Sequence, residues 1–338
     1  MPNLTPDLRS QLPEDLLDVA NSLIVGSTKA YHVFKERFQT AQSTIELFGQ
    51  DIWDGVGYPL SLQHGQTPLL AGVTCCDSRV SLREITGGAV GDSFGAKNIC
   101  GGVETQDIIS LALYEVSKNP ITSQEQMNKF LEDFSVRVDP NRLSGEAIQH
   151  ITYAFHIGVK KYLVLGHGRC GGVANAFNKK HEQELPWNAT TEELTLRLMY
   201  LQKSYLREMV RKNGVDYYIN QIPDAKVDNE EAKLHLAGEL AHAQHTAQLA
   251  DAYIRENLEP DPNNRKMPVA RGFFDIRSLN VYLGALNDKP YVQLTYNEPF
   301  ADLSVDNCCG HNHAIPPDPI AKDGLGKGPI DQGRRHQS

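Results

Sequence analysis

The hydrophobic and polar positions of this chain follow two different periods in turn. Short apolar runs bounded by polar residues predict buried strands at 69–75 and 162–166, and 92–97 fits a third strand. Around these strands, apolar residues spaced three and four apart predict helices over 14–50, 105–118, 145–158, 191–212 and 230–258. Strands that alternate with helices form parallel sheets covered on both faces. We therefore predict an α/β fold with a mostly parallel central β-sheet flanked by helices.

The C-terminal third of the chain completes the predicted sheet and then loses its periodicity. Two further strands are predicted at 269–276 and 281–286. The sheet then has about four strands plus a short extra strand. Segments near 119–143 and 176–230 are longer than simple connections require. We predict a single domain over residues 1–305 that carries these two insertions, followed by an extended or mobile tail at 306–338.

Charge and composition exclude several classes of partner. The 338 residues include 42 acidic and 33 basic ones, for a formal net charge of -9. This balance argues against nucleic acid and anionic membrane surfaces as partners. No stretch approaches the ~20 apolar residues that span a bilayer, and the polar N-terminal residues lack a secretory signal pattern. We expect a cytoplasmic protein.

The six cysteines comprise two adjacent pairs and two single residues, which does not resemble a disulfide framework. Reduced thiols in a cytoplasmic protein indicate metal binding or catalysis more than cross-links. We interpret Cys76 and Cys100 as thiols without a ligand role. The Cys308-Cys309 pair lies in the predicted tail, where we interpret it as incidental.

Two polar motifs follow predicted strands and carry the candidate chemistry. The first is Cys75-Cys76-Asp77-Ser78-Arg79, and the second is Gly166-His167-Gly168-Arg169-Cys170-Gly171-Gly172. Sites in open parallel sheets form beyond the carboxyl ends of the strands, so these motifs are expected to meet. Two Cys thiolates and one imidazole suit zinc, and three protein ligands leave a fourth position for water.

Asp77 and Arg79 extend this prediction from a metal site to a catalytic one. Asp77 lies two residues after Cys75, within reach of the metal or of its water, and Arg79 can bind the Asp77 carboxylate with two donors. Metal binding lowers the pKa of water from ~15.7 to ~7. Asp77 paired with Arg79 would leave the fourth position open and orient the resulting hydroxide toward a small electrophilic carbon.

Cys-x-Asp-Ser-Arg followed by Gly-His-x-x-Cys-Gly-Gly resembles the signature of β-class carbonic anhydrases. The resemblance implies Zn²⁺ held by Cys75, His167 and Cys170, with Asp77 and Arg79 as a dyad that gates the fourth position. It implies reversible hydration of carbon dioxide to bicarbonate and a proton by zinc-bound hydroxide. It also implies a homodimer or an assembly of dimers, in which N-terminal helices pack on the partner subunit and both subunits contribute to the pocket.

The same resemblance implies a substrate pocket. Gln66, in Gln66-Thr67-Pro68, is expected to hydrogen-bond the substrate, and Phe94 is expected on the apolar wall that holds carbon dioxide. Ile99 and Tyr153 are further candidates for this pocket. The segment Lys97-Asn98-Ile99-Cys100-Gly101 departs from the Arg-Asn-Ala-Gly-Asn usual in the family, which leaves the details of the pocket open.

Two alternatives remain at this point. Hydrolases of carbonyl sulfide or carbon disulfide share the metal residues and the scaffold, and differ in access to the pocket. A non-catalytic zinc-binding module would keep the metal without any reaction. The complete Asp77 and Arg79 pair argues against the second alternative, because a structural zinc site has no use for a gated fourth position.

Overall fold

The computed structural model describes part of the chain, which includes both polar motifs except for residue 78. The described residues are 6–21, 23–24, 68, 70–77, 79–82, 85, 93–104, 107–222, 227, 229–259, 267–276, 278–284, 286 and 290–294. Three predictions concern residues outside these ranges: the role of Gln66, most of the helix over 14–50, and the tail at 306–338. The structure does not test them.

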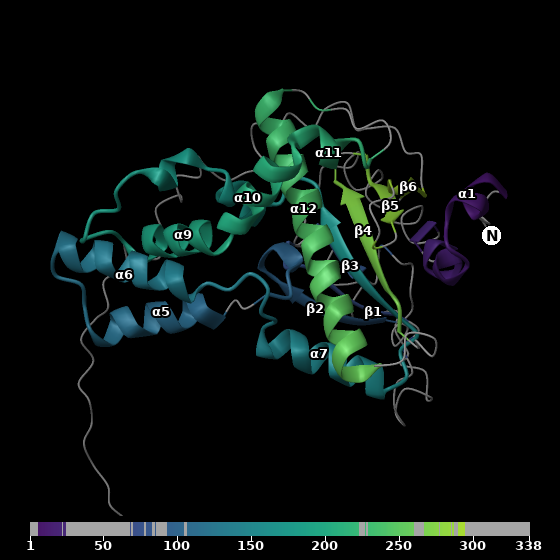
Figure 1. Cartoon of the computed structure of the whole chain (residues 1–338), viewed down its shortest axis with the longest axis horizontal. Helices are drawn as coiled ribbons and strands as arrows, with labels where there is room; N and C mark the ends of the chain where they lie inside the picture. The colour runs from purple at the N-terminus through teal and green to yellow at the C-terminus, as the bar shows by residue number, and fades with distance from the viewer. Residues whose placement is uncertain are drawn as a thin grey trace, which may run out of the picture. The chain divides into compact units, whose positions relative to one another are not determined.

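A six-stranded sheet forms the centre of the described structure, in the order β2-β1-β3-β4-β5-β6 (Figure 1). The strands are β1 (Leu70–Cys75), β2 (Ser93–Asn98), β3 (Lys161–His167), β4 (Val269–Asp275), β5 (Asn280–Gly284) and β6 (Val292–Gln293). The first four in spatial order pair in parallel, whereas β5 and β6 are antiparallel. The mostly parallel sheet is therefore confirmed. β6 was not predicted, since two residues are too few to show a period.

Both faces of the sheet are covered, as the uninterrupted apolar runs predicted. Alternate residues of a strand point to opposite faces. Leu163 and Leu165 of β3 pack in a cluster with Leu8 and Leu16 of the N-terminal segment. Val164 packs on the other face with residues of α7 and α12. The N-terminal elements are α1 (Pro6–Gln11) and η1 (Glu14–Leu16), and those of the other face are α7 (Gly145–His156) and α12 (Glu230–Tyr253).

Helix α12 runs directly over the part of the sheet that carries the second motif (Figure 1). A Cβ added to Gly166 would lie 2.9 Å from the Cβ of Ala243 on α12. Two small residues thus allow the helix to approach the end of β3 closely. The chain then continues from α12 into a π-helical segment, η5 (Ile254–Leu258), so the helix predicted over 230–258 is confirmed with a change of geometry near its end.

The two predicted insertions contribute to a further, smaller apolar cluster of helices. It joins α5 (Asp107–Lys118), α6 (Gln124–Arg137) and α9 (Thr191–Gln202), with Phe134 and Leu198 fully buried. Helix α6 was not predicted, because polar residues dominate its sequence. It is nevertheless amphipathic, and the Ser123 hydroxyl accepts a hydrogen bond from the Gln126 N–H at its start.

The region predicted as helical over 191–212 consists of two helices, α9 and α10 (Ser204–Asn213). The two helices meet at Lys203, which is the C-cap of α9 and whose buried side chain pairs with the equally buried Glu104 carboxylate. The remaining elements of the described chain are η3 (Ile99–Gly101), α8 (Gly171–Ala176), η4 (Lys179–Glu182) and α11 (Val215–Ile219). Within the described residues, no helix combines the length and apolarity needed to cross a membrane.

Candidate metal centre

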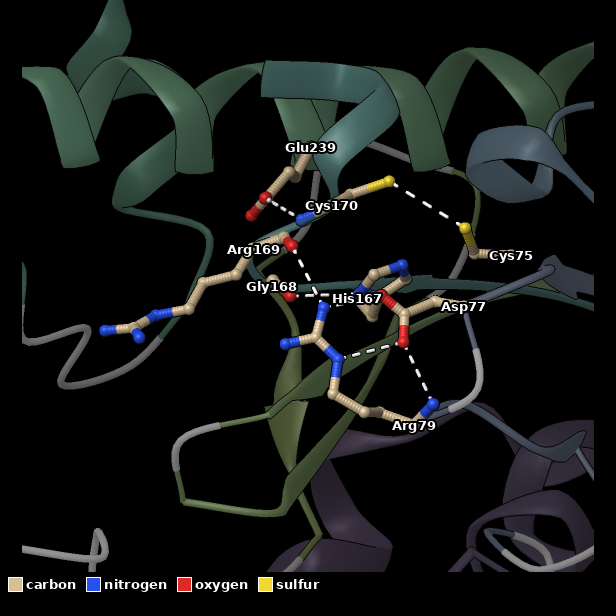
Figure 2. Close-up of polar contacts among 8 residues, drawn as sticks. All are labelled: Cys75, Asp77, Arg79, His167, Gly168, Arg169, Cys170 and Glu239. Carbon is tan, nitrogen blue, oxygen red and sulfur yellow. Dashed lines mark hydrogen bonds and ion pairs between the residues drawn. The ribbon is translucent and has the colours of Figure 1, made fainter. Parts of the chain in front are cut away.

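Three candidate ligands meet where two neighbouring parallel strands end. Cys75 is the last residue of β1, His167 is the last residue of β3, and Cys170 precedes α8 as its N-cap. Their ligand atoms all lie within 4.8 Å of one another, and all three residues are buried. The sulfur atoms of Cys75 and Cys170 are 3.9 Å apart (Figure 2). The motifs therefore converge as the sequence predicted, and the Cys-His-Cys group is positioned to bind a metal.

The imidazole of His167 fits this role at both ring nitrogens. Its Nδ1 lies 2.9 Å from the backbone oxygen of Gly168, so Nδ1–H donates to this carbonyl and the ring is held in one orientation. The remaining nitrogen, Nε2, is buried and makes no hydrogen bond of normal geometry within the described structure. A buried polar nitrogen without a hydrogen-bond partner is uncommon in proteins, and a metal ion bound at Nε2 would provide that partner.

The three groups differ in how readily they lose a proton. The hydrogen bond from Cys170 lowers the pKa of the Cys75 thiol to about 4, and His167 contributes in the same direction. The pKa of the Cys170 thiol is raised, since it interacts with the thiols of Cys100 and Cys75 and is buried. Negative charge thus concentrates on Cys75 beside His167. A dication has a charged sulfur ready to bind, and binding it favours loss of the Cys170 proton.

Asp77 and Arg79 form a bidentate ion pair next to the metal-binding group (Figure 2). The Arg79 Nε donates to Asp77 Oδ1 at 2.9 Å, and the second guanidinium nitrogen lies 2.5 Å from Oδ2. The backbone N–H of Arg79 also donates to Oδ1. Burial opposes ionisation of Asp77, but these contacts outweigh it and lower the pKa of the carboxyl group. Asp77 is therefore a carboxylate held by fixed donors at neutral pH.

Glu239 of α12 supports the loop between His167 and Cys170, and it belongs to neither of the two sequence motifs. Its Oε1 accepts a hydrogen bond from the Cys170 backbone N–H at 2.8 Å (Figure 2). In the same loop Arg169 has a left-handed backbone, with φ 58°, and its carbonyl oxygen accepts from Arg79 at 3.5 Å. Burial raises the pKa of Glu239 to about 8. The only sequence signal for this role is one acid within the otherwise small and apolar stretch Leu236–Ala241.

Replacing Glu239 tests whether this support matters for metal binding. We expect Glu239→Leu to weaken zinc binding by about 10- to 100-fold, the usual effect of losing a partner that orients a ligand. Glu239→Gln keeps an oxygen acceptor of the same reach, so a smaller loss is expected. Competition with a chromogenic chelator measures both constants. Equal zinc affinity of Glu239→Leu and the wild type would show that the loop needs no such support.

The predicted pocket residues fall in two places. Phe94 of β2 and Tyr153 of α7 contact each other, with ring centroids 5.5 Å apart, and Phe94 also stacks on His150 at 4.7 Å. Ile99 lies instead beside the start of α8, where a Cβ on Gly172 would be 3.1 Å from its Cγ2. Ile99 is 45% exposed and Tyr153 is 52% exposed. Their roles in a substrate pocket remain predictions, as does that of Gln66.

A match to a family model shows to which protein family this chain belongs. The family model described as carbonic anhydrase matches residues 70–259, which is more than half of the chain and includes both motifs. The chain belongs to the β-carbonic anhydrases. This is a family of enzymes, and its members are metalloenzymes. The family assignment thus agrees with the residues that the two motifs bring together.

Solved structures with a similar fold are also β-carbonic anhydrases. One is a tetrameric enzyme of the filamentous ascomycete Sordaria macrospora, with 18% identity, a TM-score of 0.40, and coverage of 76% of this chain and 96% of that chain. Another is CafA of Aspergillus fumigatus, with 18% identity, a TM-score of 0.38, and coverage of 77% and 92%. The Coccomyxa enzyme in complex with acetazolamide has 15% identity, a TM-score of 0.43, and coverage of 71% and 85%. No curated protein matches the chain.

Proposed function

We propose that this β-carbonic anhydrase catalyses the reversible hydration of carbon dioxide to bicarbonate and a proton. The observation that carries the proposal is the meeting of the ligand atoms of Cys75, His167 and Cys170 within 4.8 Å, where the buried Nε2 of His167 has no hydrogen-bond partner among the described residues. Two sulfur donors and one imidazole suit zinc, and three protein ligands leave one position for a small molecule. When bound there, Zn²⁺ would supply the Lewis acidity that makes water a nucleophile at neutral pH.

Asp77 is the residue that would direct this nucleophile. Its carboxylate is ionised and fixed by two donors of Arg79, so it can accept a hydrogen bond without moving. Accepting the hydrogen of the attacking water aligns the lone pair with the substrate carbon. Because Arg79 holds both carboxylate oxygens, Asp77 is also kept away from the metal, and the fourth position stays open.

The exposure of the predicted pocket residues supports a partner subunit. Ile99 and Tyr153 are large apolar or aromatic residues that are about half exposed in the single chain. A pocket for carbon dioxide has to exclude water around the substrate. We therefore infer a homodimer, or an assembly of dimers, in which a second copy covers this region.

Reduced thiols are required for the metal site, which supports a cytoplasmic location.

Turnover of purified protein distinguishes the proposed reaction from its nearest rivals. We expect stopped-flow measurements to show carbon dioxide hydration that depends on zinc, with hydrolysis of carbonyl sulfide and carbon disulfide much slower. Faster turnover of the sulfur compounds would assign the scaffold to that chemistry instead. If zinc is bound and none of the three substrates reacts, the chain is a zinc-binding module.

A further inference from the structure

The turn that follows β2, at residues 98–102, lies between the two segments that carry the candidate metal ligands. On one side, a Cβ added to Gly101 would lie 2.7 Å from the backbone nitrogen of Cys75, so this turn packs directly on the end of β1. On the other side, a Cβ added to Gly172 would lie 2.2 Å from Cys100 Sγ, so the turn also packs on the start of α8. The position of the 98–102 turn therefore constrains the backbone next to both candidate cysteine ligands.

The backbone of the 98–102 turn adopts a conformation that needs support from outside. Cys100 and Gly101 are both left-handed, with φ 67° and φ 70°. Glycine reaches this region freely, whereas a residue with a side chain does so at a cost. Such a conformation persists only where surrounding contacts hold it. The contacts that hold Cys100 are therefore part of what places the turn.

His242 of α12 provides a buried contact to this residue. Its Nε2 lies 3.1 Å from the backbone oxygen of Cys100. A carbonyl oxygen only accepts hydrogen bonds, so Nε2 carries the hydrogen that is donated. His242 is 3% exposed, which shelters the bond from competing water. The strained residue of the turn is thus held by a donor on the long helix that covers the sheet.

Contacts on the other side of the His242 ring fix its orientation. Nδ1 lies 2.9 Å from the hydroxyl of Tyr205, a residue of α10. The Tyr205 hydroxyl is also 3.3 Å from Glu104 Oε1, and Glu104 pairs with the buried Lys203. Rotation of the imidazole would break the contacts at both nitrogens. The donor that faces Cys100 is therefore held in place from behind.

One face of α12 holds backbone groups on two sides of the metal-binding group. His242 follows Glu239 by three residues, so the two side chains are neighbours on the helix surface. Glu239 accepts a hydrogen bond from the Cys170 N–H, and His242 donates to the Cys100 oxygen. The loop that carries Cys170 and the turn that packs on Cys75 are therefore held from the same helix.

We propose that His242 is a positioning residue for the metal centre. By holding the Cys100 oxygen, it keeps the 98–102 turn against Cys75 and Gly172, and so keeps the ligand atoms in one arrangement. His242 lies outside the group of ligand atoms that meet within 4.8 Å, so it acts through the turn and not on the metal itself. The consequence for turnover rests on the proposed function, whereas the consequence for metal binding does not.

Substitutions of His242 in the full-length protein test the inference. His242→Leu removes both hydrogen bonds, and we expect it to release zinc to a chromogenic chelator about tenfold faster than the wild type. The visible absorption bands of the cobalt-substituted protein, which report the geometry of the ligands, should shift in the same variant. His242→Gln keeps an amide N–H of similar reach and should restore both properties. A folded His242→Leu protein with the wild-type release rate and cobalt bands would overturn the proposal.

His245→Leu is the matched control, because it separates positioning from a general loss of stability. His245 lies on the same helix and its Nε2 is 2.8 Å from the backbone oxygen of Pro140, so this variant also loses a bond from histidine to a carbonyl group. Leucine keeps an apolar side chain against the Tyr205 ring. We expect a lower melting temperature with unchanged zinc release and cobalt bands. Equal changes in His245→Leu and His242→Leu would show that His242 has a structural role only.

Tyr205→Phe decides the test if His242→Leu does not fold. It removes only the hydroxyl that faces His242 Nδ1, and the cobalt bands should move in the same direction as in His242→Leu, but by less. Cobalt bands identical to those of the wild type would contradict the proposal. Carbon dioxide turnover of the wild type is measured separately, so a failure of the proposed function is seen independently of metal release and cobalt spectra.

Discussion

Cys170→Ala should lose bound zinc and, with it, carbon dioxide hydration. The substitution removes one of three ligand atoms that lie within 4.8 Å of one another, and it leaves only one sulfur and one imidazole nitrogen. Zinc sites of this kind need at least three protein ligands to retain the metal. The loss of affinity should therefore exceed the ~10- to 100-fold effect of removing a supporting residue. Metal analysis after gel filtration measures the zinc content, and stopped-flow assays measure the turnover.

The control for this substitution is Cys76→Ser, which changes an exposed thiol next to Cys75. This variant should keep one zinc per chain and the wild-type rate. Circular dichroism of Cys170→Ala should match the wild type, because the sheet and α12 do not depend on the Cys170 side chain. Retention of stoichiometric zinc by a folded Cys170→Ala protein would exclude Cys170 as a ligand.

Asp77→Asn is expected to separate metal binding from catalysis. The amide has the shape of the carboxylate but no charge, so it cannot pair with Arg79 in the same way or accept a hydrogen bond from water with the same strength. Zinc should remain bound, since Asp77 is not one of the three ligands. Hydration should fall by about 10²- to 10³-fold, the range for loss of one preorganised hydrogen-bonding group at a reacting centre. Zinc content and initial rates on the same sample test both parts.

An acid outside the site provides the comparison for Asp77. Asp133→Asn changes an exposed residue of α6 and should leave both zinc content and turnover unchanged. If Asp77→Asn instead hydrates carbon dioxide at the wild-type rate, the ion pair with Arg79 has a structural role only. If Asp77→Asn loses zinc, the carboxylate contributes to metal binding, and the gating role fails.

The sequence predicted two kinds of proximity within the site. Some residues are close because they are two or three positions apart in the sequence, and the two motifs are close because they follow adjacent parallel strands. Cys170 follows His167 by three residues, and Arg79 follows Asp77 by two, so each pair is placed by local chain geometry. The two motifs meet because β1 and β3 are adjacent and parallel. Apolar runs with both faces buried were sufficient to predict those strands.

The parts that could not be predicted come from distant segments. Glu239 contacts Cys170 across 69 residues, and His242 contacts the Cys100 carbonyl across 142 residues. Neither contact has a sequence pattern, because each depends on how closely α12 approaches the sheet at Gly166. The pairing of buried Lys203 with Glu104 is likewise a tertiary contact between residues far apart in the sequence. Local periodicity predicts which segments are helical, but not which buried polar side chains of different segments pair with each other.

Zinc K-edge X-ray absorption of the reduced, purified protein tests the central claim most directly, because it counts the donors of each element around the metal. The account predicts two sulfur atoms at about 2.3 Å, one imidazole nitrogen at about 2.0–2.1 Å, and one further light atom from solvent. Three or four sulfur donors, or a zinc enclosed by four protein groups, would contradict an open catalytic site at Cys75, His167 and Cys170.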